Sequence, residues 1–256
     1  MDTAPIELHQ FSRSHFNEKA RWALDYKNVR HVRIGYIPGA HAPQIKRLSG
    51  QSQVPVLRMD GAIVHGSATI LDALERRFPA PPLYPADATL REEALALQAR
   101  FDKELGPEVR RAVFANSLHD AAYITATFAS DKPKWKQHLF QATFPLTRIA
   151  MRRLMNITPA TGARAKANVD VLLNFIAEKS GATGYLVGDQ FSVADLTAAA
   201  LLAPGVSVDH PDMRRPDNKP AGIAALSEEW SAHPAGRWVR EIYRKHRPPR
   251  RGVLIS

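Results

Sequence analysis

The sequence contains no cysteine among its 256 residues. This absence excludes disulfides, thiolate metal ligands and a cysteine nucleophile, so no thiol of the protein can take part in disulfide exchange. The ten histidines are dispersed without the spacing of metal ligands, and we predict no metal site. The motifs of serine hydrolases, P-loop NTPases, dinucleotide-binding folds and zinc proteases are missing as well.

Long apolar runs are also absent. No segment approaches the ~18 apolar residues of a membrane-spanning helix. The first residues lack the basic and then apolar pattern of a signal peptide. We therefore expect a cytoplasmic protein without membrane insertion.

Acidic residues are outnumbered, since 35 Lys and Arg face 25 Asp and Glu, for a net charge of +10. Such a charge is compatible with nucleic acid or with an anionic substrate. The basic residues are scattered, except for a cluster from Arg237 to Arg251 that is typical of a solvated tail. We therefore do not expect nucleic acid to be the main partner.

Residues 6–79, within a predicted first domain of residues 1–79, alternate between strand and helix patterns. Apolar alternation predicts strands over 6–11, 32–36, 55–59 and 62–65. Asp60-Gly61 between the last two is a hairpin signal. Helical faces are predicted over 15–26 and 67–78, with a short helix over 42–48. The order predicts an α/β domain with a four-stranded mixed sheet.

A proline-rich segment ends this domain, with four prolines in residues 79–85. We interpret 80–88 as a linker, 89–245 as an all-helical domain and 246–256 as a basic tail. Helices are predicted over 89–118, 134–154, 163–179, 192–202 and 238–244. The polar stretch 205–221 is a long loop, which is typical of a functional or mobile segment.

Three local motifs carry the functional interpretation. Val54-Pro55 opens a strand, and a cis bond there would leave the main chain of Val54 free to pair with an extended peptide. Ser67 opens a helix whose free N–H groups suit a carboxylate. Ser192 and Asp195 have the spacing of a capping box before an apolar helix. Individually, each motif is also compatible with an ordinary strand start or helix cap.

Taken in order, these features resemble the glutathione transferase superfamily over about residues 6–245. The resemblance implies a thioredoxin-like domain that binds glutathione as co-substrate, a helical domain that shapes a site for a small hydrophobic electrophile, and a homodimer. It implies that Val54 pairs with the cysteinyl part of glutathione beside cis-Pro55, and that Ser67 binds the γ-glutamyl carboxylate. The superfamily usually has an acidic residue or Gln before this serine. This chain has Gly66 there, and Gln53 is a candidate to assist.

The resemblance also implies a reactive site where the first strand meets the first helix. Matching Lys19-Ala20-Arg21 to the superfamily's common Lys/Arg-Val-Arg makes Ser14 the candidate thiolate donor. A hydroxyl donor and a helix N-terminus both lower the pKa of a bound thiol. Ser14 is alternatively a simple helix cap, and Ser12, the amide N–H of Asn17 and His15 remain candidates for catalytic support.

We therefore expect an enzyme that activates the glutathione thiol for attack on an electrophilic carbon. Conjugation, isomerisation and dehalogenation are not distinguished by the sequence. One alternative is a non-catalytic module of the same fold that binds small molecules or proteins. Another is a basic protein associated with nucleic acid.

Overall fold

The structure is a computed structural model that describes residues 5–255. Within these residues, five strands form one mixed sheet in the order β4-β3-β1-β2-β5. Strand β1 (Glu7–Phe11) runs parallel to β2 (Val32–Tyr36), and α1 (His15–Tyr26) connects the two. Strands β3 (Val56–Met59) and β4 (Ala62–His65) form an antiparallel hairpin, and β3 is also antiparallel to β1. Asp60 and Gly61 make the tight turn, with φ values of 50° and 80°. The predicted four-stranded core is confirmed.

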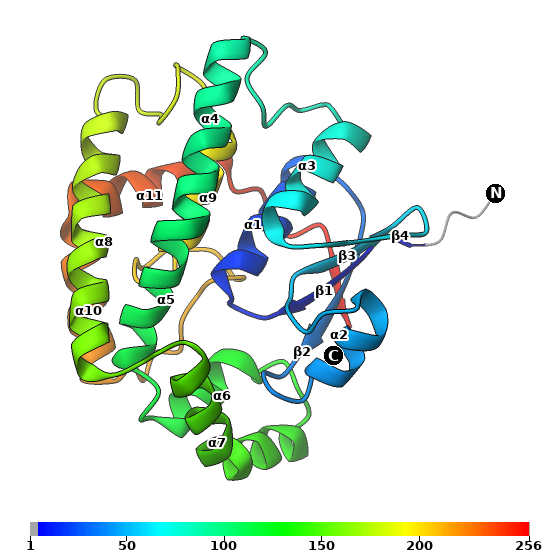
Figure 1. Cartoon of the computed structure of the whole chain (residues 1–256), viewed down its shortest axis with the longest axis vertical. Coiled ribbons are helices and arrows are strands. Elements are labelled where there is room, and N and C mark those ends of the chain that lie inside the picture. Colours follow the sequence, from blue (N-terminus) through cyan, green and yellow to red (C-terminus); the bar gives the residue numbers. More distant parts are fainter. Residues whose placement is uncertain (1–4, 256) are drawn as a thin grey trace.

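Helices cover both faces of this sheet (Figure 1). Helices α1 and α3 (Ser67–Arg77) pack together between the sheet and the helical part, and α2 (Ala42–Ser49) contacts the hairpin strand β4. The side chain of Lys27 ties α1 to Glu75 of α3 across 2.5 Å. Both side chains are largely buried, so each charge offsets the cost of removing the other from water.

The helical part extends from residue 88 to residue 246 and holds eight α-helices within this fully described range. Their bounds are α4 (Ala88–Arg100), α5 (Gly106–Ala115), α6 (Ala121–Phe128), α7 (Lys134–Leu154), α8 (Pro159–Ser180), α9 (Val193–Leu202), α10 (Ala221–Ala232) and α11 (Pro234–His246). A π-helical turn over Phe101–Leu105 joins α4 to α5, where the sequence indicated one long helical pattern with Gly106-Pro107 as a candidate kink. Helices α6 and α10 were not predicted, because neither shows a clear amphipathic period.

The buried helix α9 begins at a capping box. The Ser192 hydroxyl accepts from the N–H of Ala194, and the Asp195 carboxylate accepts from the N–H of Ser192 across 2.9 Å. Asp195 also accepts from the N–H of Leu186. These bonds satisfy main-chain donors that burial would otherwise leave without partners.

An aromatic cluster joins the sheet domain to the helical part. Trp22 of α1 is fully buried and lies 4.5 Å from Tyr243 of α11 between ring centroids. Its indole N–H donates to the carbonyl of His246. The ring of Phe191 stacks on the Trp22 side chain and also on the His246 ring. Buried aromatic area of this kind makes the two parts pack as one body.

The C-terminal residues do not form a solvated tail, which corrects the interpretation of 246–256. Strand β5 (Val253–Ile255) pairs in parallel with β2 and extends the sheet to five strands. The Arg247 side chain is fully buried against Glu18 and Asp25 of α1. Carboxylates from a distant helix compensate the basic charge, so the segment packs against the first domain. Between residues 5 and 255, no helix is long and apolar enough to cross a membrane.

Candidate functional site

Three chain segments meet at one end of the sheet. His9 of β1 pairs with Val56 of β3, so this antiparallel register brings the end of β1 toward Val54. The Val54-Pro55 peptide bond is cis. The N–H of Gly66 donates to the carbonyl of Pro55 across 3.2 Å, which places the start of α3 beside the cis bond. Helix α1 begins just beyond β1, and its N-terminus therefore lies at the same end.

The main chain before Pro55 is held by hydrogen bonds from one side chain. Gln51 accepts from the N–H of Gln53 and donates to the carbonyl of Gln53. Within residues 5–255, the N–H and carbonyl groups of Val54 have no main-chain partner. The Gln53 side chain is exposed. This edge can therefore receive an extended peptide by main-chain pairing.

The N-terminus of α3 offers a second set of donors. Gly66 has φ +85°, a left-handed conformation that glycine adopts without strain. The residue that follows, Ser67, is the first of the helix and is buried, with 7% of its surface exposed. No side chain caps α3, and its first turn carries no acidic residue. The free N–H groups and the hydroxyl are suited to a carboxylate.

Ser14 caps α1 by its main chain, while its side chain belongs to a different network. The Ser14 carbonyl accepts from the N–H of Glu18. The Ser14 hydroxyl makes no capping bond and instead accepts from the side-chain amide of Asn17 across 2.8 Å. Because Asn17 is the donor in this bond, the hydroxyl hydrogen of Ser14 is available for another acceptor.

Arg21 supports this connection and was not predicted as a site residue. Its guanidinium donates to the main-chain carbonyls of Phe11 and Ser14, both across 3.1 Å, and to the Glu18 carboxylate across 2.7 Å. It therefore fixes both ends of the β1–α1 connection and brings positive charge next to Ser14. The only sequence signal was its place in Lys19-Ala20-Arg21.

Comparison with known proteins agrees with this geometry. Residues 8–82 match the N-terminal domain of glutathione S-transferases. This part of the chain is therefore similar to the glutathione-binding domain of that family. A maleylpyruvate isomerase from Ralstonia sp is 28% identical over 130 residues, which cover 50% of this chain and 58% of that protein. Glutathione S-transferase 1 of Dianthus caryophyllus is 32% identical over 101 residues, which cover 38% and 45%. The matched stretches thus span about half the length of these two relatives.

Solved structures of the superfamily share the whole fold. A glutathione S-transferase from Rhodospirillum rubrum F11 has a TM-score of 0.64 and 20% identity, with 93% of this chain and 87% of that chain covered. A beta-etherase from Sphingobium sp. strain SYK-6 has a TM-score of 0.62 and 22% identity, with 93% and 99% covered. The predicted thioredoxin-like domain followed by a helical domain is confirmed.

Two other predicted site residues have different surroundings from Ser14. The Ser12 hydroxyl donates to the Asp131 carboxylate across 3.3 Å. His15 is buried, and its Nε2 donates to the carbonyl of Gly106 on α5 across 3.1 Å. Burial, together with the charges of Arg110 and Arg215, lowers the pKa of His15 to about 3. His15 is therefore neutral at pH 7 and attaches α1 to α5.

The approach of α1 to α5 depends on one glycine. A Cβ atom at Gly106 would lie 2.5 Å from the ring of Phe16. A larger residue at this position would require the Phe16 side chain on α1 to move. Across residues 5–255, no three His, Cys, Asp or Glu side chains gather in a way that could hold a metal ion.

Proposed function

We propose that the protein is a glutathione-dependent enzyme in which Ser14 stabilises the thiolate of the bound tripeptide. The observation that carries this proposal is the Asn17–Ser14 bond, which leaves the hydroxyl hydrogen free to donate. The N–H groups at the start of α1 and the nearby guanidinium of Arg21 add positive potential. Each of these effects favours the ionised thiol and lowers its pKa.

Glutathione would lie along the end of the sheet with its parts in three places. The cysteinyl main chain pairs with Val54 next to cis-Pro55, and the γ-glutamyl carboxylate meets the N-terminus of α3 at Ser67. Gln53 and Gly66 border the same stretch. The exposed amide of Gln53 is a candidate partner for the glutamyl end, since Gly66 offers no side chain.

The chemistry follows from the thiolate. The thiol proton leaves to solvent, and the sulfur lone pair forms a C–S bond with an electrophilic carbon. In a displacement, the leaving group departs with the electron pair of its bond to that carbon. In an isomerisation, thiolate addition to a double bond is followed by rotation and loss of the same thiolate, so glutathione is regenerated. The related isomerase and beta-etherase are named for two different outcomes, and we propose a thiolate route for this chain without choosing between them.

A homodimer is part of the same proposal because the resemblance implies it, and the cytoplasmic location expected from the sequence stays a prediction. The second candidate is a non-catalytic binding module of the same fold, which Gly66 favours because it removes the usual side chain next to Ser67. Association with nucleic acid is the weakest alternative. The Arg247 side chain is fully buried, so part of the predicted basic tail is not available to nucleic acid.

Glutathione titration tests the proposal. Thermal unfolding of the full chain should shift upward with glutathione, because a ligand of the native state stabilises it by mass action. Turnover of an activated aryl halide should depend on both glutathione and Ser14. The control is Thr69→Ala, which alters an exposed hydroxyl in the same turn of α3 as Ser67. Binding without turnover of any electrophile would favour the module, and no binding at millimolar glutathione would refute the proposal.

A further inference from the structure

A cavity of about 200 Å³ lies beside the β1–α1 connection. It is bounded by that connection, by β2, by the segment after α6, by the loop before α10 and by the C-terminal residues that lead into β5. Its lining is dominated by guanidinium groups, from Arg13, Arg21, Arg33 and Arg250, and contains two carboxylates, from Asp131 and Asp212. Arg250 is more than two hundred residues away in the sequence from the other three arginines.

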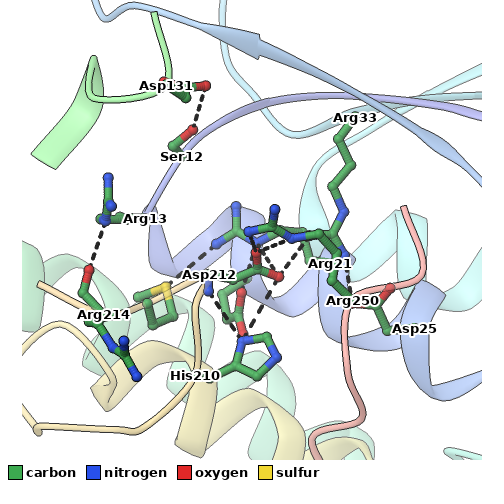
Figure 2. A network of polar contacts seen from close by, with 12 residues as sticks. Ser12, Arg13, Arg21, Asp25, Arg33, Asp131, His210, Asp212, Arg214 and Arg250 are labelled. Atoms are coloured by element: carbon green, nitrogen blue, oxygen red, sulfur yellow. Dashed lines mark hydrogen bonds and ion pairs between the residues drawn. The ribbon is translucent and has the colours of Figure 1, made fainter. Parts of the chain in front are cut away.

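Figure 2 shows how this lining is organised. Arg33 and Arg250 donate to Asp212 across 2.7 Å and 2.6 Å, and Arg21 approaches it at 3.8 Å. Burial acts to raise the pKa of Asp212, but the surrounding arginines outweigh it and hold this pKa well below its ordinary range. Asp212 is therefore ionised and fully engaged by arginine. The wall has more cations than anions.

Two guanidinium nitrogens in this lining have no acceptor. Arg13 donates through Nε and Nη1 to main-chain carbonyls and to Ser130, and Arg250 donates through Nε and Nη2 to Asp212. In the part of the chain that the structure describes, Arg13 Nη2 and Arg250 Nη1 make no hydrogen bond. Arg13 and Arg250 both line the cavity, and unused guanidinium donors on such residues favour an oxyanion ligand.

Asp131 specifies the ligand further. Its Oδ2 atom accepts from Ser12 and lies 3.1 Å from the ammonium of Lys132. Its Oδ1 atom is buried and has no donor among residues 5–255. A buried acceptor without a donor costs free energy, so a ligand that brings a hydroxyl is favoured. A fully deprotonated anion would instead be repelled by this carboxylate.

We propose that this cavity binds an oxyanion that carries its own hydroxyl group, such as hydrogen phosphate or a hydroxycarboxylate. The anionic oxygens accept from Arg13 and Arg250, and the hydroxyl donates to Asp131. The cavity is smaller than the ~300–1,000 Å³ of sites for drug-sized ligands, which fits a small ion or the anionic end of a longer molecule.

The cavity is separate from the proposed glutathione anchors. Val54 and Ser67 belong to the β3–β4 side of β1, whereas Arg33 and Leu254 of the cavity belong to β2 and β5 on the other side. Ser12 and Arg13 immediately precede Ser14 in the shared connection. A bound anion would thus lie near the reactive end of α1 without occupying the tripeptide site.

Calorimetric titration of the full chain with inorganic phosphate and with sulfate, at constant ionic strength and without glutathione, tests the proposal directly. Sulfate has no hydroxyl at neutral pH, so phosphate should bind at least about tenfold more tightly, the ratio expected for one hydrogen bond to a charged group. Asp131→Asn should remove or reverse this preference. Asp209→Asn is the matched control, because the Asp209 side chain is 91% exposed on the loop before α10.

A second pair of variants tests the arginines. Arg250→Ala should weaken phosphate binding at least about tenfold, while Arg251→Ala, an exposed neighbour, should leave it within about twofold. Asp131→Asn keeps the shape of the side chain, so its result remains decisive if Arg250→Ala is poorly folded. No phosphate binding at millimolar concentration, or equal affinity for phosphate and sulfate, would overturn the proposal.

Kinetics separate the two sources of the anion, and this arm alone rests on the proposed function. If the ligand is the anionic end of the co-substrate, phosphate should compete with an electrophile that carries a hydroxycarboxylate, and not with an uncharged one. If the ligand is free phosphate, it should bind without competing with either. Because the titration needs no glutathione, failure of the proposed enzyme activity leaves the anion site testable.

Discussion

The side-chain amide of Asn17 donates to the hydroxyl of Ser14 across 2.8 Å, one turn apart on α1. Both residues also carry main-chain N–H groups at the helix start, so a thiolate at this point would meet a hydroxyl donor and a partial positive charge together. The pair makes a double-mutant cycle possible.

Ser14→Ala should raise the pKa of the glutathione thiol in the complex by about one unit or more. One hydrogen bond to a charged group contributes about as much free energy as the 1.36 kcal/mol that corresponds to one pKa unit. Absorbance of the thiolate against pH measures this shift. Asn17→Ala should have a smaller effect, and the double variant should lose less than the sum of the two, because Asn17 acts through Ser14. Ser12→Ala is the control, and an equal shift for Ser12→Ala would contradict the assignment.

Ser67→Ala should weaken glutathione binding without much change in the chemical step. The hydroxyl and the N-terminus of α3 contact only the glutamyl end in our proposal, so the loss should appear as a rise in KM of about tenfold with kcat nearly unchanged. Initial rates at varied glutathione separate the two constants. Thr69→Ala should leave both unchanged, and a fall in kcat alone for Ser67→Ala would speak against this placement.

The sequence predicted the parts of the fold that have local signals. Alternating apolar residues and Asp60-Gly61 indicated the hairpin, and the Ser192–Asp195 spacing indicated the start of α9. The C-terminal segment was misinterpreted because Arg247 and Arg250 are paired with Asp212, and Arg247 also with carboxylates on α1. No periodicity or motif reports a partner two hundred residues away, so basic residues that are buried as ion pairs have the same appearance as basic residues in solvent.

The residues of the candidate site also differ in whether a local sequence signal indicates them. Val54, Pro55 and Ser67 stand out because a proline at a strand start and a serine at a helix start are local features. Arg21 and the lining of the anion cavity do not stand out, because their meaning depends on which carbonyls and carboxylates the fold brings near. The long loop 205–221 was predicted to be functional or mobile, and it supplies Asp212.

Stability should depend on pH through His15. Its pKa is about 3 in the folded chain, lowered by burial and by Arg110 and Arg215, against about 6.5 in the unfolded chain. Between these values the unfolded chain takes up a proton that the folded chain excludes. The contribution is thus fully present above about pH 6.5 and is lost as the pH falls toward 3, by at most about 1.4 kcal/mol per pH unit. Urea unfolding at several pH values measures how the free energy of unfolding depends on pH. This dependence should be weaker for His15→Gln than for the parent protein, whereas His119→Gln, at an exposed site, should leave it unchanged.

The buried arginine of the C-terminal segment should be the most sensitive position outside the site. Arg247 donates to Glu18, Asp25 and Asp212 at 2.8 Å each, and its side chain is fully buried. Arg247→Ala leaves these carboxylates partly uncompensated in the interior, so we expect a loss of about 3–5 kcal/mol in the free energy of unfolding.

Arg244→Ala is the matched control on the preceding helix. Arg244 pairs with Glu241 at the surface, and an exposed pair contributes about 0–1 kcal/mol. Chemical denaturation of both variants measures the difference. If both variants lost the same small amount of unfolding free energy, the C-terminal segment would not be anchored through Arg247. Another interaction would then have to hold Arg250 and Leu254 in the wall of the anion cavity. If only Arg247→Ala is destabilised, α1 depends on the C-terminal segment for the charge balance of Glu18 and Asp25. A truncated chain that ends before Arg247 should then bind glutathione more weakly, although every residue proposed to touch glutathione is still present.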